Sequence, residues 1–443
     1  MRLSGRLVVP AVLVVIALAC WLPQFGAISR EGVSSASPRW CGEGRLEVRE
    51  GLHILHLRGG PYDIGYQHGV LLRQEIRSRL RDQVLGSLLS GGDTSHLLLL
   101  RYARYVDSYL PAEYRYEMRG LADGAGLSYS DVLLLNSYEE LISAPIPRQD
   151  VRELLLTLHA PFMPHYGSVV IPPSQAESPG RESSVEALHH RTLGTFAAFG
   201  TATQGGRLLH AVDLSPPEPN LDEILIIVYE PDVGNRVIVV GRPGMVGATV
   251  GLNEEQISVV GLASPSQDAS PDGVRLPVLL REVLHHAGDI RTSVSLIASG
   301  RRTSGYNVLI GDGKPADAQA VELSAHQYAV FQAENDLLVR TNHYLDPDLS
   351  ETQQIVSQTE QQDSRGRFDE IYEGLYSDYG RLDLLTAVDL LAREHVADIE
   401  DQGTQNREPV TGILIASSAL EIHVVFHREG KTDVLGVKLD EVL

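Results

Sequence analysis

The sequence predicts an α+β protein in which two sheets of antiparallel strands pack against each other under layers of helices. In the first third of the 443-residue chain, apolar residues recur at spacings of three and four, as they do along one face of a helix. After residue 193, short β-branched runs bounded by Gly, Pro or Asn come in blocks, with pairs of helical segments between them. Such an alternation of strand blocks and helix pairs is typical of a layered sandwich.

Four helical segments are predicted before residue 145. The first begins at Pro61 and carries an apolar stripe from Ile64 to Val84. The predicted segments are 61–84, 97–109, 112–122 and 130–142. A long surface loop follows over 145–191, because the Pro, Ser and His residues there cannot sustain regular structure.

A β-hairpin is predicted directly after this loop. Its strands span 193–200 and 208–213 and join through a turn at Gly205-Gly206. The remaining predicted elements are strands over 224–229, 237–240 and 257–262, helices over 275–287 and 290–299, strands over 306–310, 318–323, 328–332 and 337–340, helices over 351–375 and 382–395, and a closing meander of strands over 411–417, 421–427 and 433–438.

The composition is that of an ordinary globular protein, 43% hydrophobic and 21% charged. With 58 acidic and 37 basic side chains the net charge is -21, so long-range repulsion opposes contact with a phosphate backbone, and nucleic acid is not an expected partner. The two cysteines allow neither a disulfide scaffold nor a cysteine-built metal site. No cofactor is expected, because the sequence has no phosphate loop, dinucleotide fingerprint or convincing metal cluster.

Residues 1–28 are predicted to be a signal peptide or an N-terminal membrane anchor. Arg2 and Arg6 precede an apolar run over 7–22, which is the build of a secretory signal. The run of about 16 residues is short for a spanning helix of about 20, and Cys20 after small residues hints at a lipid anchor, so cleavage, retention and lipidation all stay open. Each of them predicts an exported, extracytoplasmic protein, and residues 29–50 are predicted to be a tether.

Eight short motifs occur in an order and spacing that resemble one known family. They are Gly60–Gly65 with His68-Gly69, Tyr114–Gly126, Asp131–Asn136, Gly244–Gly247, Gly251–Glu254, Ser304–Asn307, Val321-Glu322 and Thr341–Tyr344. Together they resemble the isopenicillin N acyltransferase-like (acyl-coenzyme A:6-aminopenicillanate acyltransferase) family of N-terminal-nucleophile (Ntn) hydrolases. The resemblance extends over residues 51–443, which we take as one domain.

This resemblance implies a four-layer αββα fold and a precursor that cuts itself to expose a new N-terminal nucleophile. The freed α-amine, with a pKa of about 8, then serves as the base for its own side chain. The implied reaction opens a carbon–nitrogen amide bond of a small-molecule amide or acyl substrate through an acyl-enzyme.

The catalytic positions of the family are altered in this chain. Leu193 stands where the resemblance places the nucleophilic cysteine, and Asp213 stands where it places an asparagine that stabilises the oxyanion. An ionised carboxylate only accepts hydrogen bonds, so Asp213 would have to be protonated to serve. Val212 and Ser215 also replace an arginine and an acidic residue of the family pattern.

Thr195 is the candidate replacement for the missing nucleophile. Self-cleavage at Gly194-Thr195 would expose it, and a shift of two residues keeps the side chain on the same face of a strand. The shift also moves the nucleophile by about 6 to 7 Å, against a catalytic tolerance of about 1 Å. Thr195 is alternatively an ordinary residue of a strand.

Two functions follow from these readings. The first is an exported amidohydrolase or acyltransferase that uses Thr195 as a relocated nucleophile and Asp213 in a reworked oxyanion site. The second is a catalytically inactive family member that serves as a binding or scaffold domain at the cell surface.

Candidate substrate-binding residues are Asn253, Glu254 and Asn307. The resemblance places the turn that carries Asn253 and Glu254 beside the pocket, although a turn also needs Asn for its backbone geometry. Asn307 and Glu322 lie on or beside neighbouring strands and belong to either the pocket or the scaffold.

Neither of two histidine pairs is expected to bind a metal. His189-His190 lies in the predicted loop and is expected to be solvated, since a metal site needs three or four convergent ligands. His285-His286 ends a predicted helix, where a positive charge suits the helix dipole.

Overall fold

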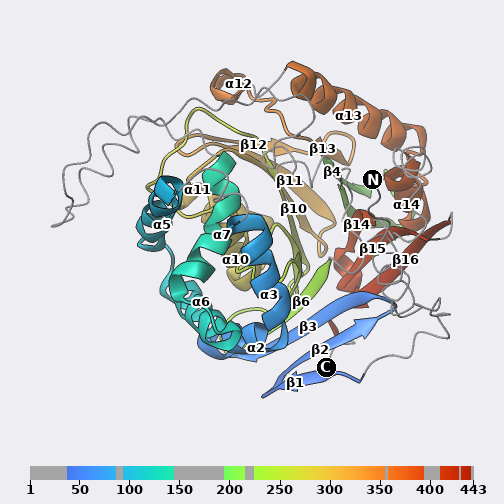
Figure 1. The fold of residues 1–443 in the computed structure, drawn as a ribbon. Coiled ribbons are helices and arrows are strands. Elements are labelled where there is room, and N and C mark those ends of the chain that lie inside the picture. Colours follow the sequence, from blue (N-terminus) through green and yellow to red (C-terminus); the bar gives the residue numbers. More distant parts are fainter. Residues whose placement is uncertain are drawn as a thin grey trace, which may run out of the picture. The chain divides into compact units, whose positions relative to one another are not determined.

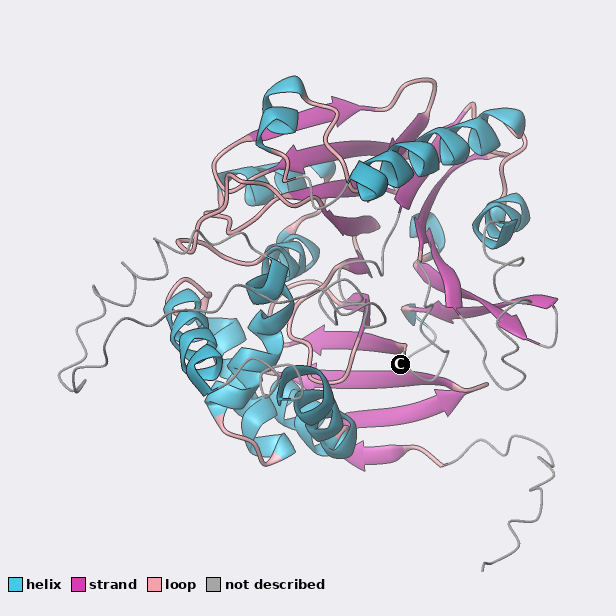
Figure 2. Ribbon diagram, turned by 45° about the horizontal axis from the view of Figure 1, so that its top comes forward, coloured by secondary structure: helices cyan, strands magenta, loops and turns pink. Residues whose placement is uncertain are grey.

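Two β-sheets face each other at the centre of the fold, and helices cover the outer side of each sheet (Figure 1, Figure 2). The computed structural model describes residues 37–85, 93–143, 194–214, 224–354, 358–393, 410–428 and 431–440. One apolar core lies between helices and the larger sheet, two lie between the sheets, and one lies between the smaller sheet and its helices. The predicted four-layer αββα sandwich is therefore confirmed.

The larger sheet has ten strands in the order β1-β2-β3-β6-β7-β8-β9-β10-β11-β12. The pairing of β3 with β6 is parallel and brings Gly59 opposite Pro231, whereas the other pairings in this sheet are antiparallel. The strands are β1 Arg39–Cys41, β2 Gly44–Arg49, β3 Leu52–Gly59, β6 Leu225–Pro231, β7 Val237–Gly241, β8 Val250–Asn253, β9 Ile257–Ala263, β10 Tyr306–Asp312, β11 Asp317–Leu323 and β12 Tyr328–Gln332.

The smaller sheet has six antiparallel strands in the order β13-β4-β5-β14-β15-β16. The predicted hairpin forms β4 and β5 near its centre, and the predicted closing meander forms β14, β15 and β16. The strands are β13 Leu337–Arg340, β4 Gly194–Gly200, β5 Gly206–Asp213, β14 Val410–Ala416, β15 Glu421–Arg428 and β16 Lys431–Lys438.

Helices of the first half, together with α10 and α11, cover the larger sheet, and α13 and α14 cover the smaller one (Figure 1). The single helix predicted over 61–84 is broken at Leu72, whose φ of -120° and ψ of 29° are not helical. The helices are α2 Pro61–Leu71, α3 Arg73–Arg79, the π-helix η1 Leu80–Leu85, α5 Asp93–Asp107, α6 Ala112–Ala125, α7 Tyr129–Ser143, α10 Leu276–His286, α11 Ile290–Ser299, α12 Pro347–Thr352, α13 Gln358–Ser377, the 3-10 helix η3 Ser417–Ala419 and α14 Leu384–Arg393.

Helices α2 and α6 approach each other closely because glycines line their contact. A Cβ at Gly65 would lie 1.9 Å from the Glu117 carbonyl oxygen, and one at Gly120 would lie 2.0 Å from the Tyr62 carbonyl oxygen. This contact explains why two of the sequence motifs are rich in glycine. It also places the side chain of Glu117 beside the larger sheet.

The predicted tether was wrong at its C-terminal end. Residues 39–49 of the predicted tether 29–50 form β1 and β2, which pair with each other and with β3, and Leu46 is buried. β1 is the outermost strand of the sheet, and most residues of β1 and β2 are exposed or only partly buried, so these strands need few apolar residues. The predicted signal over 1–28 and the loop over 145–191 lie outside the described residues. Within the described residues, no helix has both the length and the apolar character needed to cross a bilayer.

Candidate functional site

The β4-β5 hairpin carries both predicted catalytic residues at its open end. Thr195 pairs with Val212 on one side and with Arg340 of β13 on the other, and Gly194 pairs with Asp213. The register changes at a bulge between Ala198 and Gly200. This bulge determines which residues of β5 share a face with Thr195.

The two predicted catalytic residues lie on opposite faces of the smaller sheet. Val212, directly opposite Thr195, packs in the core between the sheets, so Thr195 faces the larger sheet. Asp213 is the next residue along β5 and faces the other way, toward α13 and α14. The glycines paired with Asp213 confirm this side, since a Cβ at Gly194 or at Gly412 would contact a side chain of α13 or α14. The structure does not bring Thr195 and Asp213 to the same face of the sheet, and a catalytic role for either residue stays a prediction.

The hydroxyl of Thr195 is enclosed by the sheet. The residue has no exposed surface, and its Oγ1 donates a hydrogen bond of 2.7 Å to the carbonyl oxygen of Ala211. A nucleophilic hydroxyl needs a base that accepts its proton and a path for the substrate. A backbone carbonyl is not such a base. The hydrogen bond gives the buried hydroxyl of Thr195 an acceptor within the sheet, which is a structural role.

A buried ion pair, Arg340 with Glu322, lies beside Thr195. Arg340 Nε is 3.0 Å from Glu322 Oε1, and the two side chains are 4% and 0% exposed. Glu322 Oε2 accepts hydrogen bonds from the backbone N–H groups of Leu345 and Asp346. Burial raises the pKa of Glu322, while the charge of Arg340 opposes the shift. The pair ties β13 of the smaller sheet to β11 of the larger one.

Arg340 was missed in the sequence. It follows three apolar residues at the end of a predicted strand, where a basic residue is expected to be exposed to solvent. Its partner Glu322 lies in a different apolar strand. The sequence shows two isolated charges in two apolar runs, and nothing in it indicates that they pair. The stacking of Arg340 on Phe331, with 4.3 Å from Cζ to the ring centroid, comes from a third strand and leaves no local signal.

Asn307 holds the backbone of the segment that follows β13. Its Nδ2 donates to the carbonyl oxygens of Thr341 and His343 at 2.7 and 2.8 Å. His343 Nδ1 in turn lies 2.9 Å from Ser364 Oγ, and burial lowers the pKa of His343 to about 4. The Thr341–Tyr344 motif therefore forms a hydrogen-bonded scaffold, and the predicted substrate-binding residue Asn307 lies within it.

Asn253 and Glu254 are also engaged in the scaffold. Asn253 Nδ2 donates to the carbonyl oxygens of Leu284 and Ala287 at the end of α10, and its Oδ1 accepts from the N–H of Ile257. Glu254 binds the backbone and side chain of Arg236.

These two residues lie at the wrong end of β9 to reach Thr195. They precede β9, so they lie at its Ile257 end. Thr195 pairs with Arg340, and Asn342, two residues further along the chain, donates a hydrogen bond to the Ala263 carbonyl oxygen at the other end of β9. A strand from Ile257 to Ala263 spans about 20 Å at about 3.3 Å per residue. Substrate contacts by Asn253 or Glu254 stay a prediction, and the structure gives both side chains other partners.

His285 does not carry the helix-end charge that was predicted for it. It is buried, burial lowers its pKa to about 2, and its Nε2 accepts a hydrogen bond of 2.8 Å from Arg281 Nε. Glu113, His285 and His286 place ligand atoms within 4.8 Å of one another. A neutral His285 that accepts at Nε2 must carry its proton on Nδ1, so it offers no lone pair to a metal ion. His189-His190 lies outside the described residues.

Known proteins with similar sequences share only part of their length with this chain. An uncharacterized protein of Archaeoglobus fulgidus is 26% identical over 415 residues, which cover 85% of this chain and 64% of that protein. Protein dcd1A of Dictyostelium discoideum is 22% identical over 318 residues, which cover 63% of this chain and 60% of that protein. The chain thus spans less than two thirds of the length of these relatives.

Solved structures give weaker similarities. The N-acylethanolamine-hydrolyzing acid amidase ortholog of Caenorhabditis elegans has a TM-score of 0.37 and 14% identity, covering 51% of this chain and 93% of that one. A conjugated bile acid hydrolase variant from Clostridium perfringens has a TM-score of 0.37 and 12% identity, covering 56% and 93%. Penicillin V acylase from Agrobacterium tumefaciens has a TM-score of 0.35 and 11% identity, covering 56% and 86%.

The family model of the acyl-coenzyme A:6-aminopenicillanic acid acyl-transferases matches residues 202–386. The match begins after β4, so the strand that would carry the nucleophile lies outside it, while β5 to β13 and most of the motifs lie inside. It agrees with the order of the motifs and with the four observed layers. Residues 202–386, less than half of the chain, are thus similar to the acyl-coenzyme A:6-aminopenicillanic acid acyl-transferases.

Proposed function

We propose that this protein binds a small acyl or amide compound and does not hydrolyse it through an acyl-enzyme at Thr195. The hydrogen bond from Thr195 Oγ1 to the Ala211 carbonyl carries the proposal, because it commits the hydroxyl proton to an oxygen that does not act as a base. The burial of Thr195 supports the same conclusion.

The altered oxyanion position also supports the proposal. Asp213 replaces the amide that the family resemblance requires, and an ionised carboxylate repels a developing oxyanion. A protonated Asp213 would still lie on the face of the sheet opposite Thr195. The expected oxyanion site therefore fails for two separate reasons, one chemical and one geometric.

The ligand class comes from the family. Its members are Ntn-type amide hydrolases and acyltransferases, whose substrates are small acyl or amide compounds. This chain keeps the two sheets and both helical layers of that fold. Loss of the nucleophile with retention of the scaffold favours a protein that recognises such compounds.

A comparison of the natural protein with a Thr195→Val variant tests the proposal. Valine keeps the shape of threonine and removes its hydroxyl, so a nucleophile would be lost while the strand is retained. We expect neither protein to release amine from a series of N-acyl amines and N-acyl amino acids of increasing chain length. We expect both to bind the same members of the series in a thermal-shift titration, because a bound ligand raises the stability of the folded state. Amine release by the natural protein that is lost in Thr195→Val would overturn the proposal in favour of catalysis by Thr195.

We also propose that the protein is exported and remains attached to, or is released from, the outer face of a membrane. Arg2, Arg6 and the apolar run over 7–22 support export. Expression of the full chain followed by cell fractionation and N-terminal sequencing tests this. A cytoplasmic chain that begins at Met1 contradicts export, and a lipid on Cys20 selects lipidation over cleavage or retention.

A further inference from the structure

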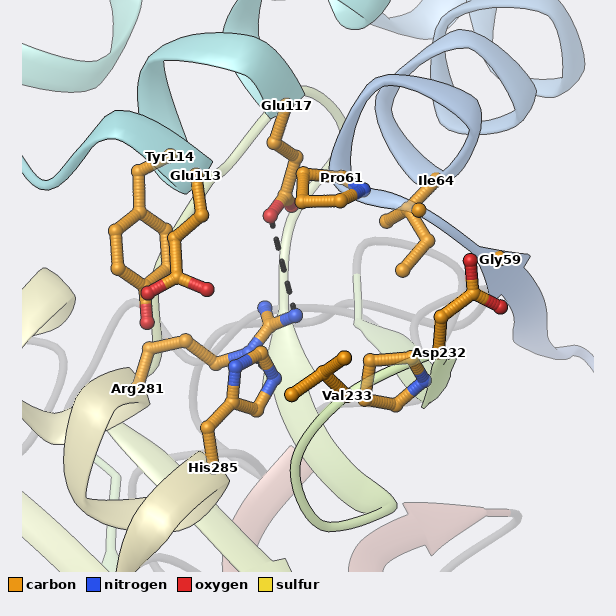
Figure 3. A pocket seen from close by; sticks show the side chains of 12 residues that line it. Gly59, Pro61, Ile64, Glu113, Tyr114, Glu117, Asp232, Val233, Arg281 and His285 are labelled. Atoms are coloured by element: carbon orange, nitrogen blue, oxygen red, sulfur yellow. Dashed lines mark hydrogen bonds and ion pairs between the residues drawn. The ribbon is translucent and has the colours of Figure 1, made fainter.

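A cavity of about 310 Å³ lies between the larger sheet and its helices, away from the hairpin. Its walls come from the β3-α2 junction, from α6, from the turn between β6 and β7, and from α10 (Figure 3). This volume is at the small end of the range of natural ligand sites. Two of the glycine-rich motifs, Gly60–Gly65 and Tyr114–Gly126, contribute residues to its wall.

The guanidinium of Arg281 occupies the centre of this cavity wall (Figure 3). Two contacts fix its plane: Nε donates to His285 Nε2 at 2.8 Å, and Cζ lies 3.3 Å from the centroid of the Tyr229 ring. Arg281 is fully buried, and these contacts use its Nε and its face. The edge that carries Nη1 and Nη2 takes part in neither contact, and both atoms are shielded from solvent.

Neither Nη1 nor Nη2 has a hydrogen-bond acceptor among the described residues. The carboxylate of Glu117 faces this edge, but its Oε2 is 4.0 Å from Nη2, which is too long for a hydrogen bond. The carboxylate of Asp232, also in the wall, points toward Gly59 and away from Arg281 (Figure 3). A buried guanidinium without a hydrogen-bonded counter-ion is costly.

A third donor belongs to the same wall. Since His285 Nε2 accepts from Arg281, its proton is on Nδ1, and this buried N–H also has no acceptor among the described residues. Burial meanwhile raises the pKa of Glu117 and raises that of Glu113 to about 7, so both acids are shifted toward their neutral forms. Arginine keeps its charge at any physiological pH. The wall therefore presents a fixed cation and an excess of donors.

We propose that this cavity is a binding site for a small monocarboxylate. The carboxylate would accept two parallel hydrogen bonds from Nη1 and Nη2 of Arg281, the planar arrangement in which arginine binds such groups most strongly. Pro61, Ile64 and Val233 provide apolar wall for a short aliphatic or aromatic tail. The site is independent of the chemistry proposed for the hairpin.

Calorimetric titration of the full-length protein with benzoate and with hexanoate tests this site. Benzamide and hexanamide are the matched controls, because each has the shape of its acid without the charge. We expect at least one acid to bind at least tenfold more tightly than its amide. Equal binding of acid and amide, or no binding of either acid at millimolar concentration, overturns the proposal.

Two variants separate this site from a purely structural ion pair. Val233 is 81% exposed, so Val233→Trp narrows the cavity without disturbing the buried core, and we expect it to weaken acid binding at least tenfold. Glu117→Gln keeps this position neutral at every pH with little change in shape, so no protein carboxylate competes with the ligand for Arg281, and we expect it to tighten acid binding severalfold. If Glu117 is instead the permanent counter-ion of Arg281, Glu117→Gln leaves acid binding absent and lowers the unfolding midpoint. That result also overturns the proposal.

Discussion

Substitution of Glu322 by glutamine should strongly destabilise the protein, because it breaks the ion pair that joins the two sheets. The pair is 3.0 Å long and almost fully buried, and Glu322 also accepts two backbone hydrogen bonds at 2.8 and 2.9 Å. Glutamine restores part of the hydrogen bonding but leaves the charge of Arg340 buried without its partner. Removal of one member of a buried pair costs about 3–5 kcal/mol of unfolding free energy.

The matched control is Glu254→Gln, which breaks a pair of similar chemistry near the surface. Arg236 and Glu254 are 2.8 Å apart with side chains 29% and 31% exposed. Solvent screens such a pair, so the expected loss is at most about 1 kcal/mol. Urea unfolding followed by circular dichroism measures both losses from the midpoint and slope. Equal losses for the two variants, or a loss below about 1 kcal/mol for Glu322→Gln, would refute the assignment of Glu322 and Arg340 as the link between the sheets.

Two further predictions concern packing and pH. Gly65→Ala should lower the free energy of unfolding by about 3 kcal/mol or more, because its Cβ would lie 1.9 Å from the Glu117 carbonyl oxygen. The control Gly366→Ala in α13, whose Cβ would have nothing within 4 Å, should raise that free energy by about 0.5–1 kcal/mol. Similar urea midpoints for the two variants would contradict the close contact of α2 and α6. His210 is buried, and burial lowers its pKa to about 3. As the pH falls below about 6.5, the histidine of the unfolded chain therefore takes up a proton before that of the folded protein. The free energy of unfolding should fall by about 1.4 kcal/mol per pH unit from there toward pH 3. His210→Asn should therefore lose less stability between pH 7 and pH 5 than the natural protein, and an equal loss in both would contradict a neutral buried histidine.

The layers of the fold were predictable from local patterns. Apolar periodicity identified α6, α7, α10 and α11, and alternating runs next to Gly and Asn identified most strands of both sheets. β1 and β2 were missed because few of their residues are buried, so their sequences lack an apolar run. The break at Leu72 was missed because the apolar stripe continues through it, and the stripe reports which face is buried rather than whether the backbone is continuous.

The relation between Thr195 and Asp213 could not be predicted, because it depends on one residue in the hairpin. At the turn Gly200 pairs with Gly206, and continuation of that register would put Thr195 opposite Ala211 and on the same face as Asp213. The bulge after Ala198 shifts the register by one residue, so Thr195 lies opposite Val212 instead. A slip of one residue moves every following side chain to the other face.

The partners of the buried charges were equally inaccessible to sequence reasoning. Arg281 and Glu117 lie on helices far apart in the chain, and His285 appeared only as part of a pair at a helix end. Their assembly depends on the close contact of α2 with α6 and on the parallel pairing of β3 with β6. Tertiary arrangements of this kind leave only weak local signals in the sequence.

The central claim is that Thr195 is a strand residue and not a nucleophile, and intact-mass spectrometry of the purified full-length protein tests it most directly. The account predicts that the bond between Gly194 and Thr195 stays intact, so that no fragment begins at Thr195 and the natural protein and Thr195→Val give the same pattern apart from the mass of the substitution. A second chain that begins at Thr195 in the natural protein and is absent from Thr195→Val would contradict it.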